Sequence, residues 1–289
     1  MNRLAIGTAQ FGLSYGIANQ VGKVSQTEAK EILKLASNSG IKILDTAIAY
    51  GDSEKSLGNL GIQNFQLVTK LPIVPIDCQD VGVWVKEQVR SSFSRLGIKD
   101  IYGLLLHQSN QLLGSYGKDL YRELNLLKES GKVKKIGISI YSPFELEALK
   151  DKYDFDLVQA PFNIIDQRLH SSGWLSRLKN KGVEVHTRSV FLQGLLLMEQ
   201  AHIPNKFLKW SDLWYKWHNW LDDYEGTATE ACLSLPLSFP EIDKVIVGVD
   251  NSKQLLQILN SAKNLNIKSL PDLQCSNEGL INPANWPNL

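Results

Sequence analysis

The chain has 289 residues, of which 43% are hydrophobic and 21% are charged, and its formal net charge at pH 7 is +1. This composition is typical of a globular protein with enough apolar material for a sizeable core. The near-zero charge, with no block of lysine and arginine, argues against nucleic acid as a partner.

The cysteine usage and the hydropathy indicate the compartment. Cys78, Cys232 and Cys275 are far apart and odd in number, so they indicate neither a disulfide framework nor a metal-ligand cluster. This usage fits a reducing cytosol. The chain has no signal-peptide core and no run of about 18 apolar residues. We therefore expect a cytoplasmic protein without membrane contact, either a monomer or a homodimer.

In the first half of the chain, short apolar segments alternate with segments of helical period. Strands are predicted at residues 4–6, 41–44, 65–69 and 102–106. Helices are predicted from Ser25 onward and at residues 53–60, 81–96 and 118–129. Ser25 and Glu28 have the spacing of a capping box, and Gly97 and Gly131 close two of the helices.

The same alternation continues through the second half of the chain. Strands are predicted at residues 133–138, 157–160, 183–186 and 245–247. Helices are predicted at residues 172–180, 227–235 and 252–262. A further helix is predicted to begin at Ser142 and Pro143, an N-cap residue followed by a proline at the first helical position.

Eight strand–helix units without a break in composition predict the fold class. They favour an α/β protein built as a TIM-type (β/α)8 barrel, a single domain over residues 1–289. The alternative is a doubly wound open sheet, which normally carries a glycine-rich nucleotide-binding turn after its first strand. The glycines of residues 7–12 lack the spacing of that turn. The pattern therefore favours the closed barrel.

Two segments stand outside the alternation. Residues 203–226 are rich in tryptophan, and Trp210, Trp214 and Trp217 have spacings of four and three, which puts them on one helix face. This spacing predicts an amphipathic helix packed on the barrel, with a lid or a dimer contact as the alternatives. The C-terminal segment, about residues 265–289, has neither period and is predicted to be an extended tail.

Polar residues follow three consecutive predicted strands. Asp45, Lys70 and His107 each stand directly after an apolar run, and Tyr50 follows Asp45 by five residues. Active sites of α/β barrels lie at the carboxyl ends of the strands, and consecutive strands are neighbours. We therefore expect these four side chains to meet in one quadrant of the barrel mouth.

This set of side chains suits proton transfer to a developing alkoxide. Tyrosine has an ordinary pKa near 10, and a neighbouring ammonium should lower it. A carboxylate beside the lysine keeps the ammonium charged and fixed. A histidine that donates a hydrogen bond orients a carbonyl and stabilises charge on its oxygen. None of these groups supplies a hydride, so a redox reaction here requires a nicotinamide cofactor.

The same residues carry a family resemblance. The segment from Asp45 to Glu54 resembles the D-T-A-x-x-Y-G-x-S-E signature of aldo-keto reductases. Lys70 and His107 are similar to the lysine and histidine that follow the third and fourth strands in that family. The resemblance implies an NAD(P)H-dependent carbonyl reductase or alcohol dehydrogenase in which Tyr50 is the general acid. It further implies that Lys70 and Asp45 tune Tyr50, and that His107 positions the carbonyl of a small-molecule substrate.

The resemblance extends to the half of the chain that would bind the cofactor. It implies a cofactor site formed by Ser139, Gln159, Arg188, Ser189, Leu192, Gly194, Gly248, Lys253 and Gln254. Val190 departs from the family's S-P-L-x-x-G-L loop, which has proline there. Arg188 stands where many members have an aromatic residue stacked on the nicotinamide. His186 and Arg188 either line the cofactor pocket or cap their strand.

Two features of the sequence bear on the choice between NADPH and NADH. The family implies NADPH, whose 2′-phosphate often meets a basic residue after the last strand. Here Asp250 would repel that phosphate, and Lys253 is the available substitute. NADPH is the expected cofactor, with NADH as the alternative, and no metal is expected.

Two other functions remain open at this point. One is a regulatory or sensor protein that binds the cofactor on the same fold without turnover. The other is a metal-dependent barrel hydrolase, which needs several converging ligands; Asp45 and His107 are too few, and Lys70 would repel a cation. The sequence does not identify the carbonyl substrate: aldehydes, aldoses, nucleotide-linked sugars and quinoid ketones are all candidates.

Overall fold

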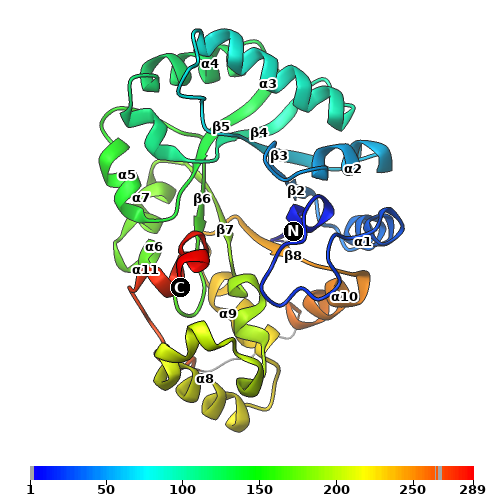
Figure 1. Ribbon diagram of the computed structural model, residues 1–289, viewed down its shortest axis with the longest axis vertical. Helices are drawn as coiled ribbons and strands as arrows, with labels where there is room; N and C mark the ends of the chain where they lie inside the picture. Colours follow the sequence, from blue (N-terminus) through cyan, green and yellow to red (C-terminus); the bar gives the residue numbers. More distant parts are fainter. Residues whose placement is uncertain (1–2, 264, 266–268) are drawn as a thin grey trace.

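A computed structural model describes residues 3–263, 265 and 269–289. Eight parallel strands close into a barrel in chain order (Figure 1). They are β1 (Leu4–Gly7), β2 (Ile43–Asp45), β3 (Gln66–Leu71), β4 (Ile101–Leu106), β5 (Val133–Ser139), β6 (Leu157–Pro161), β7 (Glu184–Arg188) and β8 (Lys244–Gly248). β1 pairs with both β2 and β8, so the sheet has no edge. The predicted TIM-type barrel is confirmed, and the open-sheet alternative is wrong.

Helices surround the barrel (Figure 1). They are α1 (Gln26–Asn38), α2 (Ser53–Leu60), α3 (Val81–Leu96), α4 (Gly117–Glu129), α5 (Pro143–Leu149), α6 (Arg168–Ser171), α7 (Trp174–Asn180), α8 (Ser211–Asp223), α9 (Ala228–Ser238), α10 (Ser252–Ser261) and α11 (Glu278–Ile281). The helix predicted at 172–180 is interrupted by Gly173, whose φ of 77° is left-handed. None of the described helices has the length and apolar character needed to cross a bilayer.

The helix starts follow the local chemistry, with one difference from prediction. The Ser25 side chain accepts a hydrogen bond from the Glu28 backbone N–H, as an N-cap does. The Glu28 carboxylate does not return to Ser25; it accepts instead from the backbone N–H of Ser252 at 2.5 Å. The predicted capping box is therefore half formed, because its acid ties α1 to the N-terminus of α10.

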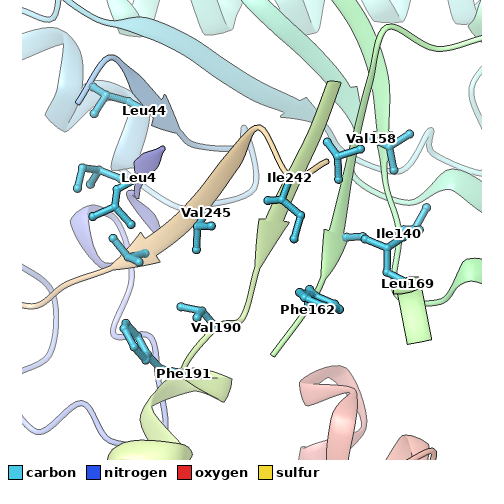
Figure 2. Packing of buried hydrophobic residues seen from close by; sticks show 14 of the residues in the cluster. Leu4, Leu44, Ile140, Val158, Phe162, Leu169, Val190, Phe191, Ile242 and Val245 are labelled. Carbon is cyan, nitrogen blue, oxygen red and sulfur yellow. The ribbon is translucent and has the colours of Figure 1, made fainter. Parts of the chain in front are cut away.

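Buried side chains form two layers that share the strands. Alternate strand residues face the ring of helices, and Leu4, Leu44 and Val158 belong to this larger cluster (Figure 2). The residues between them form a smaller cluster, which consists of Ala5, Ile43, Val68, Leu105, Leu157 and Ile246. This two-residue alternation is the strand geometry itself, since successive side chains point to opposite faces. Asp45 and Lys70 follow Ile43 and Val68 by two residues on β2 and β3, so they lie on the same inner face, nearer the carboxyl ends of these strands.

The tryptophan-rich segment packs on the molecule. Trp214 is 1% exposed and Trp217 is 0% exposed, and both lie on α8. Their indole N–H groups donate to the backbone oxygens of Phe207 and Leu196. In Figure 1, α8 lies at the opposite end of the molecule from α4. The predicted packing helix is confirmed for these two residues, while Trp210 precedes the helix and is half-buried.

The C-terminal segment differs from the predicted extended tail. Its last part contains α11 and a 3-10 helix (Pro283–Asn288), and Trp286 is 4% exposed. The side chains of Asn277 and Asn282 cap these two turns, which explains why short helices form without a helical period. Arg168 of α6 pairs with Glu278 of α11. Residues 264 and 266–268 of the predicted tail lie outside the described residues.

Candidate active site

A cavity of about 530 Å³ opens at the carboxyl ends of the strands. Side chains from the connections after β1, β2, β4, β5, β7 and β8 line it together with residues of α9 and α10. Its polar lining consists of Thr8, Gln10, Tyr15, Asn19, Asp45, Tyr50, His107, Ser139, Tyr141, Arg188, Ser189, Gln193, Thr229, Asp250, Gln254 and Gln257. The predicted quadrant of polar residues therefore lies at one mouth of the barrel, as the strand assignment required.

A buried ion pair forms the floor of this cavity. Lys70 Nζ donates to Asp45 Oδ2 at 2.6 Å and to the Thr46 backbone oxygen at 2.9 Å. Gln159 Nε2 donates to Asp45 Oδ1 at 2.6 Å. Burial lowers the pKa of Lys70, and the Asp45 carboxylate acts in the opposite direction. The described residues contain no group of three or more His, Cys, Asp or Glu side chains placed to hold a metal ion.

Tyr50 lies between this ion pair and the imidazole of His107. The Lys70 ammonium is 5.2 Å from the centroid of the Tyr50 ring, and the rings of Tyr50 and His107 meet edge to face at 5.6 Å. Burial raises the pKa of Tyr50 above its usual value, the Asp45 carboxylate adds to this, and Arg188 opposes it. The predicted lowering of this pKa is wrong, because burial dominates and the Asp45 carboxylate acts in the same direction. Tyr50 is a protonated phenol at neutral pH.

His107 is the neutral partner of this phenol. Burial lowers its pKa from 6.5 to about 4, and the positive charges of Lys70 and Arg188 act in the same direction. At neutral pH the imidazole is therefore uncharged, with one ring nitrogen able to donate a hydrogen bond. The site thus contains two neutral proton donors, Tyr50 and His107, beside the ion pair of Lys70 and Asp45, whose net charge is zero.

The loop that carries Tyr50 rests directly on the backbone of the first connection. A Cβ atom added to Gly12 would lie 1.8 Å from the Tyr50 backbone oxygen and 2.5 Å from the Ser53 backbone nitrogen. Ser53 Oγ donates to the Thr8 backbone oxygen at 2.8 Å and lies 3.0 Å from Thr46 Oγ1. The serine of the D-T-A-x-x-Y-G-x-S-E segment therefore joins the ends of β1 and β2, and it holds the tyrosine loop in place.

The glutamate of the same segment has a different task. Glu54 is 1% exposed and accepts hydrogen bonds from Thr69 and Ser92, each at 2.7 Å. The guanidinium of Arg95 completes its shell with contacts of 2.9 and 2.6 Å. These partners lie on β3 and α3, so Glu54 ties α2 to its neighbours. Burial of this carboxylate is offset by a charged and fully hydrogen-bonded environment.

The residues predicted for the cofactor separate into two groups. The lining of the cavity includes Ser139, Arg188, Ser189, Gly194, Gly248 and Gln254. Gln159 lies beneath it with no exposed surface, and its Oε1 atom has no hydrogen-bond partner among the described residues. Leu192 and Lys253 are not among the lining residues. Leu192 is 0% exposed because its turn directs it into the core, and Lys253 points to solvent from the first turn of α10.

The loop after β7 is held in a strained conformation. Ser189, Leu192 and Gln193 have φ values of 62°, 47° and 55°, which L-residues rarely adopt. Asn163 Nδ2 donates to the Ser189 backbone oxygen at 3.0 Å and so holds the backbone of this loop. Such strain persists only where the surroundings enforce it, and it concentrates at binding sites. The conformation brings Gln193 and Gly194 to the cavity wall.

The connection between β1 and α1 also lines the cavity, which the sequence analysis missed. Asn19 Nδ2 donates to Asp250 Oδ1 at 2.9 Å, and Gln193 Nε2 donates to the Tyr15 hydroxyl at 3.3 Å. Asn19 Oδ1 accepts the backbone N–H groups of Val21 and Gly22, which shapes the loop itself. The length of this connection, which has no helical or strand period, was the available signal.

Arg188 stands where the family resemblance implies an aromatic residue, and it packs against a ring. Its guanidinium lies 4.5 Å from the centroid of the Tyr141 ring. It donates to the Ile140 backbone oxygen at 2.9 Å and contacts Ser189 Oγ at 3.3 Å. His186, two residues earlier, is fully buried and hydrogen-bonded to Glu184 at 2.6 Å. Of these two residues of β7, only Arg188 lines the cavity.

Known proteins resemble this chain over nearly its whole length. A family model described as Aldo/keto reductase family matches residues 3–277. The NADH-specific methylglyoxal reductase of Escherichia coli K12 is 23% identical, and the match covers 92% of this chain and 91% of that protein. An aldo-keto reductase of Bacillus halodurans, solved in its holo form, has a TM-score of 0.71 at 19% identity and covers 94% of this chain and 89% of its own. A putative aldo-keto reductase of Pseudomonas aeruginosa has a TM-score of 0.67 at 21% identity, covering 90% and 89%.

Proposed function

Because the chain belongs to the aldo/keto reductase family, we propose that it reduces an aldehyde or ketone to an alcohol with NAD(P)H, using Tyr50 as the general acid. The observation that carries the proposal is the placement of a protonated phenol between a buried ion pair and a neutral imidazole at the mouth of the barrel. Positioned groups of this kind accelerate proton transfer by about 10²–10⁴-fold.

Each of the four residues has a distinct task in this proposal. Tyr50 donates its proton to the carbonyl oxygen as negative charge develops there. His107 donates a hydrogen bond to the same oxygen and fixes its direction. Asp45 fixes the Lys70 ammonium at 2.6 Å, and this ammonium lies 5.2 Å from the centroid of the ring that becomes a phenolate. When it is bound, the nicotinamide supplies the hydride that the carbonyl carbon accepts.

The residues present fit a nicotinamide cofactor. The unpartnered Oε1 of Gln159 is a buried acceptor beneath the cavity, where a carboxamide N–H would satisfy it. Ser139 is 2% exposed and lines the same wall. Ser189 and Gly194 border the cavity from the loop after β7. We assign these residues to the cofactor, with Asp45 Oδ1 already holding the Gln159 amide in position.

The lining supports NADH over NADPH. Asp250 borders the cavity, whereas Lys253, the candidate partner for a 2′-phosphate, is exposed and outside the lining. A carboxylate there repels an added phosphate. The Escherichia coli relative is named as NADH-specific. We therefore infer that NADH is the preferred cofactor, in place of the NADPH that the family alone implied.

Two measurements test the proposal. Quenching of tryptophan fluorescence during titration with NADH and with NADPH should report micromolar binding, tighter for NADH. A panel of aldehydes and ketones should then be reduced at rates that fall about 10²–10⁴-fold in Tyr50→Phe, with NADH binding retained. Failure of both nucleotides to bind would overturn the oxidoreductase assignment. A Tyr50→Phe variant with the wild-type rate would show that another group is the acid.

A further inference from the structure

The catalytic end of the cavity carries a single uncompensated positive charge. Among the described residues that line the cavity, Arg188 is the only lysine or arginine. The charge of Asp45 is cancelled by Lys70, and His107 is neutral at pH 7. The other lining carboxylate, Asp250, accepts from Asn19. No Asp or Glu side chain among the described residues pairs with Arg188, whose polar contacts are Ile140 O and Ser189 Oγ.

The position of this guanidinium is fixed and directed. From the end of β7 it reaches back past β6 to residues after β5, where it donates to the Ile140 backbone oxygen and stacks on Tyr141. It therefore points away from the β8 loop that carries Asp250. Its positive charge acts on both catalytic groups. It opposes the rise in the pKa of Tyr50, and it adds to the lowering of the pKa of His107.

The contacts that hold Arg188 leave most of its donors free. A guanidinium carries five N–H groups in a planar fork, and two of them are used by Ile140 and Ser189. The remaining three can bind a planar oxyanion in two parallel hydrogen bonds. The Tyr141 ring below the guanidinium limits its rotation, so little order would be lost on binding. A guanidinium with three free donors and restricted rotation has the chemistry needed to bind a carboxylate.

We propose that Arg188 binds a carboxylate of the substrate, so that the preferred substrates are carbonyl compounds with a carboxylate near the reacting carbon, such as 2-oxo acids and short semialdehyde acids. This inference rests on the proposed function and adds the substrate class. Arg188 is then a specificity residue that anchors one end of the substrate while Tyr50 and His107 contact its carbonyl oxygen. The loops after β7 and β8 also line the cavity, and their residues would stay available to the cofactor phosphates.

The experiment compares each acid with its own methyl ester, which has nearly the same shape without the charge. Pyruvate with methyl pyruvate and succinic semialdehyde with its methyl ester provide two distances between carboxylate and carbonyl. For wild type we expect kcat/KM for at least one acid to exceed that of its ester by about 10- to 100-fold. The ratio should fall to near unity in Arg188→Met, mainly through KM, and stay intermediate in Arg188→Lys.

Two controls keep the result decisive. Arg188→Gln can retain the hydrogen bond to the Ile140 backbone oxygen without the charge, so it replaces Arg188→Met if that variant does not fold. NADH binding, followed by tryptophan fluorescence, should change less than the acid-to-ester ratio in every variant. The inference is overturned if wild type uses esters as well as acids, or if loss of the charge weakens NADH binding and leaves the ratio unchanged. Turnover of neither acids nor esters would instead contradict the proposed function.

Discussion

Lys70 Nζ lies 2.6 Å from Asp45 Oδ2, in an ion pair whose side chains are 1% and 5% exposed. The two residues come from adjacent strands, β3 and β2, and their pairing follows from the parallel register that places Asp45 opposite Val68. Because both side chains are almost inaccessible to water, each buried charge would destabilise the fold without the other. The pair therefore couples the fold of the barrel mouth to the chemistry proposed for Tyr50, 5.2 Å from the ammonium.

Lys70→Met should cost both stability and turnover, because it leaves the Asp45 carboxylate buried without its partner. The free energy of unfolding is expected to fall by about 3–5 kcal/mol, measured by urea denaturation. The double variant Asp45→Asn with Lys70→Met removes both charges and keeps an oxygen that can accept from Gln159, so it should recover most of that loss without recovering activity. Equal stability of the single and double variants would show that the buried charge is not the cause.

His107 should make stability depend on pH in a defined window. Its pKa is lowered from 6.5 to about 4 in the folded protein, so the unfolded chain binds this proton more readily. Stability is therefore lost as pH falls from 6.5 toward 4, by at most about 3 kcal/mol for a shift of this size. Unfolding of His107→Asn, followed across this window, should show a smaller decline than wild type. Parallel pH profiles of the two proteins would contradict the assignment.

The charge of Asp250 should set the cofactor ratio. Asp250→Asn keeps an oxygen that can accept from Asn19, and it removes only the carboxylate charge. Two like charges about 4 Å apart repel by about 1 kcal/mol in water and by more in a less polar site. The variant should therefore improve NADPH relative to NADH by about five- to tenfold or more, measured as dissociation constants. An unchanged ratio would place the 2′-phosphate away from Asp250.

Gly12→Ala should displace the tyrosine loop, since the new methyl group would lie 1.8 Å from the Tyr50 backbone oxygen. The Gly12 backbone has an ordinary φ of −119°, so the effect would come from this contact alone. We expect a loss of about 1–3 kcal/mol in stability and a larger fractional loss in kcat. Gly114→Ala is the matched control, because its added Cβ would meet its nearest atom at 3.4 Å. Similar losses in both variants would contradict the argument.

The order of the strands and helices could be predicted from the sequence because local residue patterns determine it. Alternation of apolar strands with capped helices specified eight units, and the predicted helices at 53–60 and 81–96 match α2 and α3 at both ends. The candidate catalytic residues were equally accessible. Each follows a strand directly, and the carboxyl ends of parallel strands meet at one mouth in a closed barrel.

Contacts between distant segments could not be predicted in this way. Asn19 and Asp250 are 231 positions apart, and neither lies in a segment whose period reveals its neighbours. Glu28 has the spacing of a capping box with Ser25, yet its carboxylate accepts from Ser252, which only the closure of the barrel brings near. A local motif indicates which hydrogen bonds a side chain is able to form. The tertiary structure determines which of these hydrogen bonds form.

The electrostatics of the site show the same division between what the sequence determines and what the tertiary structure determines. The sequence by itself determined that an aspartate, a tyrosine, a lysine and a histidine gather at the barrel mouth. It did not determine the direction of the Tyr50 pKa, which burial and Asp45 raise although a lysine stands nearby. Nor did it place Arg188 against Tyr141 with most of its donors free. Burial and the cancellation of neighbouring charges are sums over the whole fold, and for that reason only the tertiary structure decided them.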